Sequence, residues 1–254
     1  MSAPGGAGTG GTGPTGVGPD GSAPSGVDVG AGGHGLTGVE DAGAFLARLV
    51  RLDRSAPVRL RSTATSGRTA LWGRLPWGVL VVRTVAGTGP ADATVAAGEL
   101  LAALENRRTE LPARRDAQWR WPLPPTGSRA VETLPAAEVR RIADAAAGTL
   151  RTAAVHGVGG RAVGQRVLRD ALLDHVPVVV TPDTGPAEPV EVSQRLIQGL
   201  VRMGFLGSAD ADPAGGVGVR ASGRWVGLVG PFGAAWSQKV VDLAVTPVRA
   251  RPFG

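Results

Sequence analysis

Few side chains in this sequence have the types and spacing needed for catalysis. Asp170, Asp174 and His175 lie close together, and such a group could hold a metal ion or transfer a proton. A histidine at a helix C-terminus is also stabilised by the helix dipole, so a surface role is the simpler interpretation. The chain has no cysteine, which excludes a thiolate nucleophile and a thiolate metal site. We therefore expect no catalytic residues, no cofactor, no metal site and no enzymatic activity.

Arginine is the most prominent group with binding chemistry. The formal net charge is +6, and Lys239 is the only lysine among the 27 basic residues. A basic surface of this kind can bind phosphate groups. However, the chain avoids lysine and is rich in alanine, glycine, valine and proline, as is typical of GC-rich, actinobacterial genomes. The arginine excess therefore has two interpretations, an anion-binding surface or a solvated basic surface.

The clearest helix start in the sequence is Val192-Ser193, where Ser193 is a natural N-cap and Gly204 a natural end. Two strands, 216–221 and 224–229, then flank a tight turn at Ser222-Gly223. This helix and hairpin resemble the second half of winged-helix regulators, in which the helix enters the major groove of DNA and the hairpin touches the backbone. The resemblance implies nucleic acid as a partner. The nucleic-acid-binding residues that it implies are Arg195, Arg202, Arg220 and Arg224.

Two other functions stay open. Trp119 and Trp121 lie on the same side of an extended, proline-rich segment, where they could bind another protein in an assembly role or pack on the chain's own prolines. The glycines of Gly157–Ala162 precede a helix, as in a nucleotide-binding loop, but no buried strand leads into them. The first pattern favours a protein-interaction factor. The second is the only trace of a nucleotide-binding enzyme.

The elements that position these residues follow from hydrophobic periodicity. Apolar residues spaced three and four apart predict helices, and short alternating or continuous apolar runs predict strands. The predicted helices are 39–52, 94–108, 136–154 and 161–175, besides the one after Ser193. The predicted strands are 56–63, 69–75, 78–85, 176–181, 189–192 and 240–248, besides the hairpin.

The two ends of the sequence share one order of features, which indicates an internal duplication. Leu49-Val50-Arg51 ends the first helix and Leu200-Val201-Arg202 the last, at an offset of 151 residues. The offset is 156 at the turns that follow and 155 between Pro76-Trp77-Gly78 and Pro231-Phe232-Gly233. Chance similarity in a chain of low diversity is the alternative explanation.

Together these patterns predict an α+β protein in which a helical middle segment joins two modules, each a helix plus a β-hairpin. Residues 1–35 hold 14 glycines and 4 prolines and no basic residue, which predicts a disordered tail. The sequence shows no membrane-spanning run and no secretory signal, so we expect a cytoplasmic protein that does not enter a membrane. The oligomeric state is not predicted. The predicted divisions are a tail at 1–38, a module at 39–110, a linker at 111–135 and a second module at 136–254.

Overall fold

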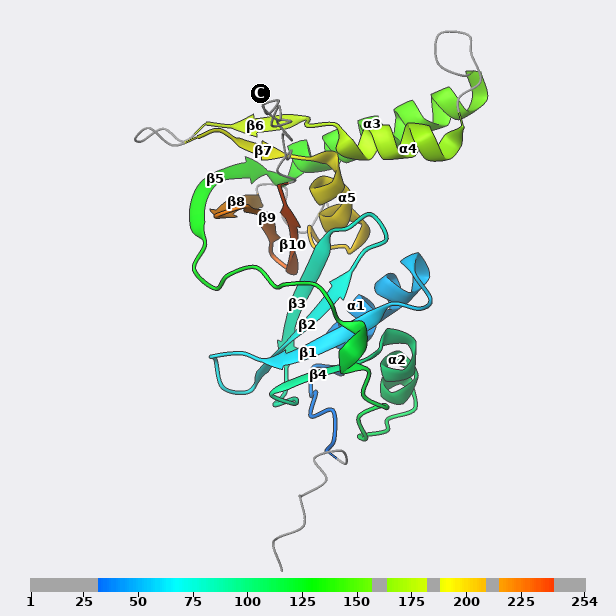
Figure 1. The fold of residues 1–254 in the computed structure, drawn as a ribbon, viewed down its shortest axis with the longest axis vertical. Helices are drawn as coiled ribbons and strands as arrows, with labels where there is room; N and C mark the ends of the chain where they lie inside the picture. Colours follow the sequence, from blue (N-terminus) through cyan, green and yellow to red (C-terminus); the bar gives the residue numbers. More distant parts are fainter. Residues whose placement is uncertain (1–31, 157–163, 182–187, 209–214, 240–254) are drawn as a thin grey trace, which may run out of the picture. The chain divides into compact units, whose positions relative to one another are not determined.

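An antiparallel sheet of eight strands runs through the described chain (Figure 1). The computed structural model describes residues 32–156, 164–181, 188–208 and 215–239. Within them the strand order is β4-β1-β2-β3-β10-β9-β8-β5, and β6 pairs with β7 in a separate two-stranded sheet. The strands are β1 Pro57–Ser62, β2 Arg68–Arg74, β3 Leu80–Ala86, β4 Asp92–Ala96, β5 Arg129–Pro135, β6 Val178–Val180, β7 Val190–Val192, β8 Gly216–Ser222, β9 Trp225–Gly230 and β10 Gly233–Gln238.

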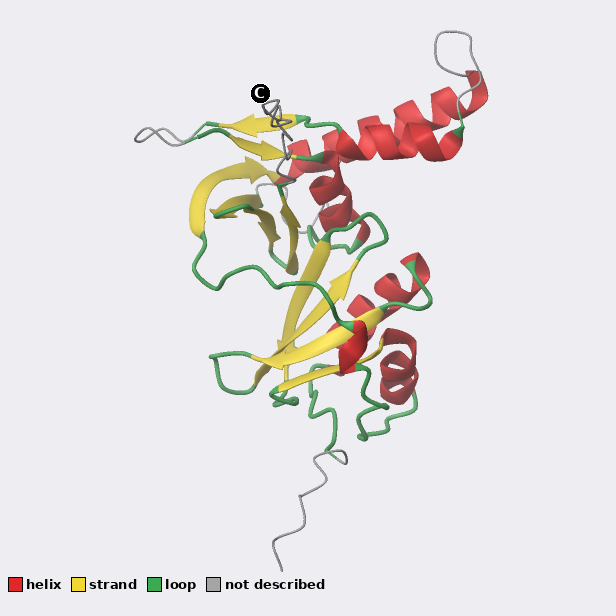
Figure 2. Cartoon of the chain, viewed as in Figure 1, coloured by secondary structure: helices red, strands yellow, loops and turns green. Residues whose placement is uncertain are grey.

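Most strands follow one another in consecutive antiparallel runs between the helices, so the α+β class predicted from the sequence is confirmed (Figure 2). The helices are α1 Val39–Leu52, α2 Ala97–Glu105, α3 Ala136–His156, α4 Gln165–Asp174 and α5 Gln194–Arg202, with a short 3-10 helix, η1, at Asp116–Gln118. In α1 the apolar residues fall on one face, and Ala42, Phe45, Leu46 and Leu49 are buried.

The predicted repeat is visible in the order of the elements. Helix α1 is followed by the meander β1-β2-β3, and α5 is followed by the meander β8-β9-β10. The last strands of the two meanders, β3 and β10, pair antiparallel at the middle of the sheet, with Val81 opposite Ala235. An antiparallel pair between equivalent strands relates the two halves by an approximate two-fold rotation. Both halves therefore contribute to one continuous sheet.

The two faces of the sheet are covered differently. Alternate residues of a strand point to opposite faces. On β9, Val226 and Leu228 join the large core with the helices, whereas Trp225 and Val229 join a second, tryptophan-rich cluster. Helix α5 covers the first face, because its Gly199 lies against Ala235 of β10. The segment between η1 and β5 crosses the other face (Figure 1).

Three strands were not predicted. Strand β4 overlaps the start of the predicted helix 94–108, β5 lies inside the predicted linker, and β10 begins at Gly233, before the predicted strand 240–248. Strand β5 is mostly exposed and lacks the apolar alternation that reveals a buried strand. Residues 240–248 lie outside the described residues, as does the glycine-rich tail up to residue 31. The predicted division of the chain into domains stays a prediction.

Residues 32–38, which were expected in the tail, contact the fold. Gly33 forms an isolated bridge with Glu110, and Leu36 forms one with Gly87. His34 is 5% exposed, and its Nε2 lies 2.8 Å from the carbonyl oxygen of Arg108. A buried, hydrogen-bonded histidine anchors this segment, which the glycine-rich composition around it does not reveal.

The helix and hairpin differ from a winged helix in their surroundings. Both hairpin strands lie inside the sheet, because β8 also pairs with β5 and β9 also pairs with β10. In α5 the side chains of Leu196, Ile197 and Leu200 are fully buried against the sheet. The likeness to a winged helix is therefore limited to the order of helix and hairpin.

Candidate functional site

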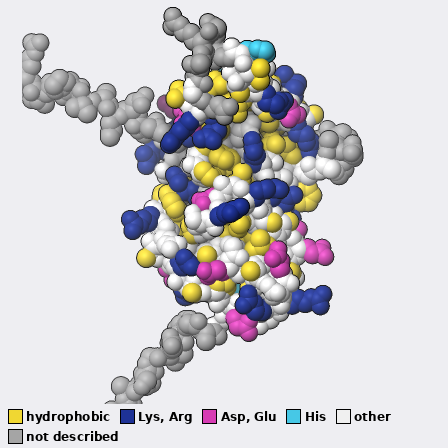
Figure 3. Space-filling model, turned by 90° about the vertical axis from the view of Figure 1, so that its right-hand side faces the viewer, with side chains coloured by type: hydrophobic (Ala, Val, Ile, Leu, Met, Phe, Trp, Pro, Cys, Tyr) yellow, Lys and Arg dark blue, Asp and Glu magenta, His cyan; other side chains and the backbone are white. Residues whose placement is uncertain are grey.

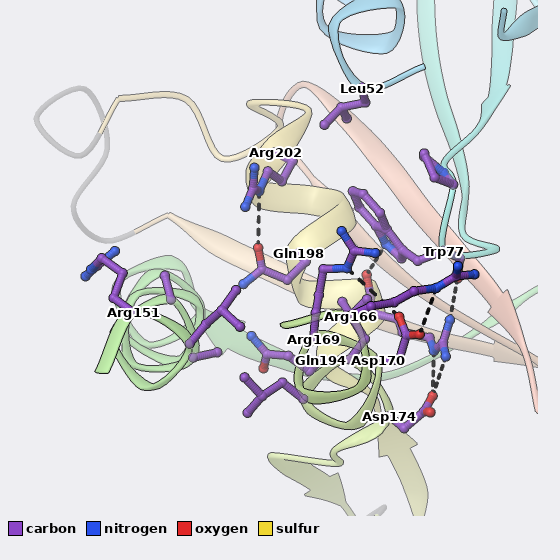
Figure 4. A pocket seen from close by; sticks show the side chains of 17 residues that line it. Leu52, Trp77, Arg151, Arg166, Arg169, Asp170, Asp174, Gln194, Gln198 and Arg202 are labelled. Atoms are coloured by element: carbon purple, nitrogen blue, oxygen red, sulfur yellow. Dashed lines mark hydrogen bonds and ion pairs between the residues drawn. The ribbon is translucent and has the colours of Figure 1, made fainter. Parts of the chain in front are cut away.

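An open cleft of about 1000 Å³ lies where α3, α4 and α5 meet the end of α1 and the turn between β2 and β3. We call it the arginine cleft, because five arginines and two aspartates contribute to its lining (Figure 4). The charged residues that line it are Arg151, Arg166, Arg169, Arg195, Arg202, Asp170 and Asp174. Apolar side chains lie between them, among them Leu52, Trp77, Leu150 and Leu173.

The cleft combines sequence positions that are far apart. Leu52 ends α1, Trp77 follows β2, Leu150 lies on α3, Leu173 lies on α4, and Gln194 begins α5. Leu173 and Gln194 are buried, whereas Leu52, Trp77 and Leu150 are partly exposed to the cleft. Packing of the two repeats against α3 and α4 therefore creates this site, and no single segment of sequence carries it.

Arg195 is held rigidly at one end of the cleft. Its Nε donates to Oδ1 of Asp174 at 2.7 Å, and its Nη1 donates to the carbonyl oxygen of Trp77 at 2.7 Å. In return, Nε1 of Trp77 donates to the carbonyl oxygen of Arg195 at 3.2 Å. These contacts join α4, α5 and the turn after β2. Arg195 therefore has a structural role within the described fold.

Replacing Arg195 with methionine is expected to lower the free energy of unfolding by about 1 to 2 kcal/mol, because hydrogen bonds from a charged donor are lost while the aliphatic stem is kept. Partial exposure keeps the loss at the lower end of what such bonds contribute. Urea unfolding followed by circular dichroism measures it. Arg202→Met is the matched control, because Arg202 is exposed and its Nε lies 3.5 Å from Gln198 Oε1. Equal losses in the two variants would contradict the structural role.

The other four arginines of the cleft have no close ion pair with a carboxylate in the described parts of the chain, so their charge can attract an anionic ligand. Arg151 and Arg202 are exposed and form no ion pair with any carboxylate in the described parts of the chain. Arg166 and Arg169 each lie 4.0 Å from a carboxylate oxygen of Asp170, and their side chains are 88% and 59% exposed. Loose surface pairs of this kind bind weakly. The cleft therefore has a surplus of positive charge that an anionic ligand could neutralise.

The four arginines predicted from the sequence do not share one surface. Arg195 and Arg202 both line the arginine cleft. Arg220 lies on the opposite face of the sheet, because its neighbour Val219 points into the helix-side core. There its Nε donates to Oγ of Ser128 at 2.9 Å. Arg224 is exposed at the tip of the hairpin. The structure thus brings together two of the four predicted residues.

Three further arginines of the cleft, Arg151, Arg166 and Arg169, were not selected from the sequence. They lie on α3 and α4, at positions that the helical pattern leaves outside the core. Their place on the polar faces of two predicted helices could have been used to predict a basic surface there. Figure 3 shows basic side chains beside hydrophobic ones over much of one side of the molecule, with more of the acidic ones in its lower half.

Asp170, Asp174 and His175 were considered from the sequence as a candidate group for metal binding or proton transfer, and no such role was assigned to them. Asp174 pairs with Arg195, and His175 is exposed beside it. In the described parts of the chain, no group of three or more His, Cys, Asp or Glu side chains could hold a metal ion. No helix in these parts is long and apolar enough to cross a bilayer. The glycine-rich stretch 157–162 lies outside the described residues.

The fold is similar to that of bacterial DNA polymerase sliding clamps. The beta subunit from DNA polymerase of Streptococcus pyogenes is 11% identical, with a TM-score of 0.50 over 79% of this chain and 62% of that chain. The sliding clamp of Bartonella birtlesii bound to griselimycin is 12% identical, with a TM-score of 0.50 over 84% of this chain and 66% of that one. The chain therefore spans less than two thirds of the length of either clamp. At these identities the likeness concerns the fold alone.

Two family models match the sequence side by side. Residues 36–121 match a domain of unknown function, DUF8010, and residues 123–242 match a second one, DUF8185. The boundary between them falls directly after Trp121, in the segment that crosses the sheet. No curated protein matches the chain.

Proposed function

We propose that this protein is a non-catalytic, cytoplasmic binding protein that contacts nucleic acid with the arginine cleft. The observation that carries the proposal is the surplus of arginine over aspartate in the cleft, with Arg151 and Arg202 exposed and outside the ion pairs of the described chain. Guanidinium groups bind phosphate oxygens in a bidentate manner. The shared fold of clamps that serve DNA polymerases adds circumstantial support.

Arg195 and Arg202, both predicted from the sequence, have different roles in the proposed contact. Arg195 shapes the cleft, and Arg202 with Arg151 supplies charge for phosphate groups. Arg220 and Arg224 belong to the winged-helix alternative, in which the hairpin contacts the nucleic acid backbone. Their position away from the cleft makes the two alternatives separable by mutation.

Binding of the full chain to a labelled mixed-sequence DNA duplex and to the corresponding single strand, followed by fluorescence anisotropy, tests the proposal. Affinity for nucleic acid is expected to fall steeply between about 50 and 200 mM salt, because each phosphate contact releases counterions. The double variant Arg151→Glu/Arg202→Glu is expected to weaken binding about tenfold or more at low salt. It should also lower the slope of log affinity against log salt by about two.

The matched control is Arg129→Glu/Arg224→Glu, which makes the same change in net charge at exposed residues beside the hairpin. This control is expected to retain most of the affinity. A loss of affinity in the control and not in the cleft variant would transfer the contact to the hairpin, as the winged-helix resemblance implies. Absence of binding to either DNA at low salt would refute a nucleic-acid function.

The protein-interaction alternative has less support at the place where the sequence suggested it. Trp119 is only 9% exposed and packs with Trp225 and Trp236 on the sheet of this same chain. A side chain that is buried within its own fold offers little surface to a partner. We therefore do not assign partner binding to Trp119.

A further inference from the structure

The floor of the arginine cleft is lined by apolar side chains, which phosphate binding alone does not require. Leu52, Trp77 and Leu150 are partly exposed there, between the charged residues, and the buried Leu173 also lines the cleft. A DNA duplex presents phosphates on its outside and keeps its bases stacked within. Its phosphates can contact Arg151, Arg166, Arg169 and Arg202, which we call the arginine rim, but the flat faces of its bases stay stacked inside the helix. The floor therefore indicates a ligand with both anionic and apolar surfaces.

Gln194 provides a second, independent observation. It is the first residue of α5, it lines the cleft, and it is 2% exposed. Its Nε2 is buried and has no hydrogen-bond partner. Most buried polar groups in proteins are hydrogen-bonded, so an unpaired amide in a cleft wall marks a place where an acceptor is missing. Arg83 Nε is the other such atom in the described residues, and Arg83 does not line the cleft.

We propose that the arginine cleft binds single-stranded nucleic acid, with phosphates on the arginine rim and an unpaired base against the floor. This inference rests on the proposed function and specifies its ligand. Every base carries ring nitrogen or carbonyl acceptors that could receive a hydrogen bond from Gln194 Nε2. Unpaired bases also stack on aromatic rings and on guanidinium planes, and Trp77 and the rim arginines supply such planar groups.

An acidic peptide is the competing ligand, since carboxylates and apolar side chains would also match the rim and floor. The planar character of the rim favours bases, because guanidinium and indole groups bind a flat aromatic ring over its whole face. The cleft volume of about 1000 Å³ leaves room for more than one nucleotide. We therefore commit to a short stretch of unpaired nucleotides as the occupant.

The test compares a labelled mixed-sequence single strand of about 12 nucleotides with its duplex, at equal salt and with the full chain. We expect the single strand to bind at least about fivefold more tightly than the duplex. Gln194→Leu is expected to weaken single-strand binding about fivefold and to leave duplex binding unchanged. The variant removes an unpaired buried amide, so it should not impair folding. The matched control is Gln118→Leu in η1, where the glutamine is exposed and outside the cleft lining.

A second variant, Leu150→Gln, makes the floor polar without changing charge, and it should also weaken single-strand binding selectively. Equal affinity for both DNA forms, with neither variant having an effect, would overturn the inference and leave the proposed function intact. No binding to either form would remove both. If polyglutamate displaced the single strand and its own binding were weakened by Gln194→Leu, the cleft would be a peptide site and the inference would fail.

Discussion

Replacing Phe205 with alanine is expected to lower the free energy of unfolding by about 3 to 5 kcal/mol, the usual loss for a fully buried phenylalanine. Phe205 follows α5 and is 0% exposed. Its ring stacks on that of Phe45 in α1, with 6.3 Å between the centroids and 5° between the ring planes. The pair joins the helical parts of the two repeats, so the loss should destabilise the whole described fold. Urea unfolding measures the free energy.

Two further variants make this expectation specific. Phe232→Ala changes the same residue type at a position that is 44% exposed, and it should cost less than about 1 kcal/mol. The double variant Phe45→Ala/Phe205→Ala should cost less than the sum of the single changes by about 0.5 to 1.5 kcal/mol, because each single change already removes the stacking. A Phe205→Ala variant no less stable than Phe232→Ala would show that the segment after α5 is not part of the core.

Local patterns predicted the elements with strong periodicity and missed those without it. The helix at 39–52 and the hairpin were predicted close to their observed bounds, because apolar residues recur there at helical or alternating spacing. Strand β5 has no buried residue, so only its pairing with β8 makes it a strand. Strand β10 begins at Gly233, whose φ of 154° is a backbone conformation that glycine adopts readily and other residues rarely do. Glycine is depleted in strands, so propensity alone does not predict a strand there. Strands β5 and β10 thus form because they pair with strands elsewhere in the chain, although their own sequences do not favour a strand.

The sequence predicted that arginines would supply the binding chemistry, but it did not predict which arginines lie together in the cleft. Arginine excess and the start of α5 directed attention to Arg195 and Arg202, and both line the cleft. Arg220 was grouped with them because a hairpin follows the helix in the sequence. The face to which a strand residue points depends on register, however, and register is set by partners far away in the chain. Gln194 gave no signal, because a glutamine beside an N-cap is ordinary until its burial is known.

The tryptophan cluster on the other face of the sheet leads to the second large effect. Trp119→Ala is expected to lower the free energy of unfolding by about 3 kcal/mol. Trp119 is nearly buried, its Nε1 donates to the carbonyl oxygen of Trp121 at 2.8 Å, and its ring meets that of Trp121 edge-on at 5.5 Å. The ring also packs with Trp225 and Trp236 on the sheet. Losing it should release the segment that crosses the sheet and weaken this second core.

The control for Trp119 is its neighbour Arg120, which is exposed in the same segment, and Arg120→Ala should change the free energy of unfolding by less than about 0.5 kcal/mol. The comparison decides between the two interpretations of the tryptophan pair. If the ring serves the fold, Trp119→Ala lowers the urea midpoint and Arg120→Ala does not. If the ring served a partner protein, both variants would unfold at the wild-type midpoint, since an exposed recognition residue adds little to stability. The burial of Trp119 against two strands of the second repeat predicts the first result.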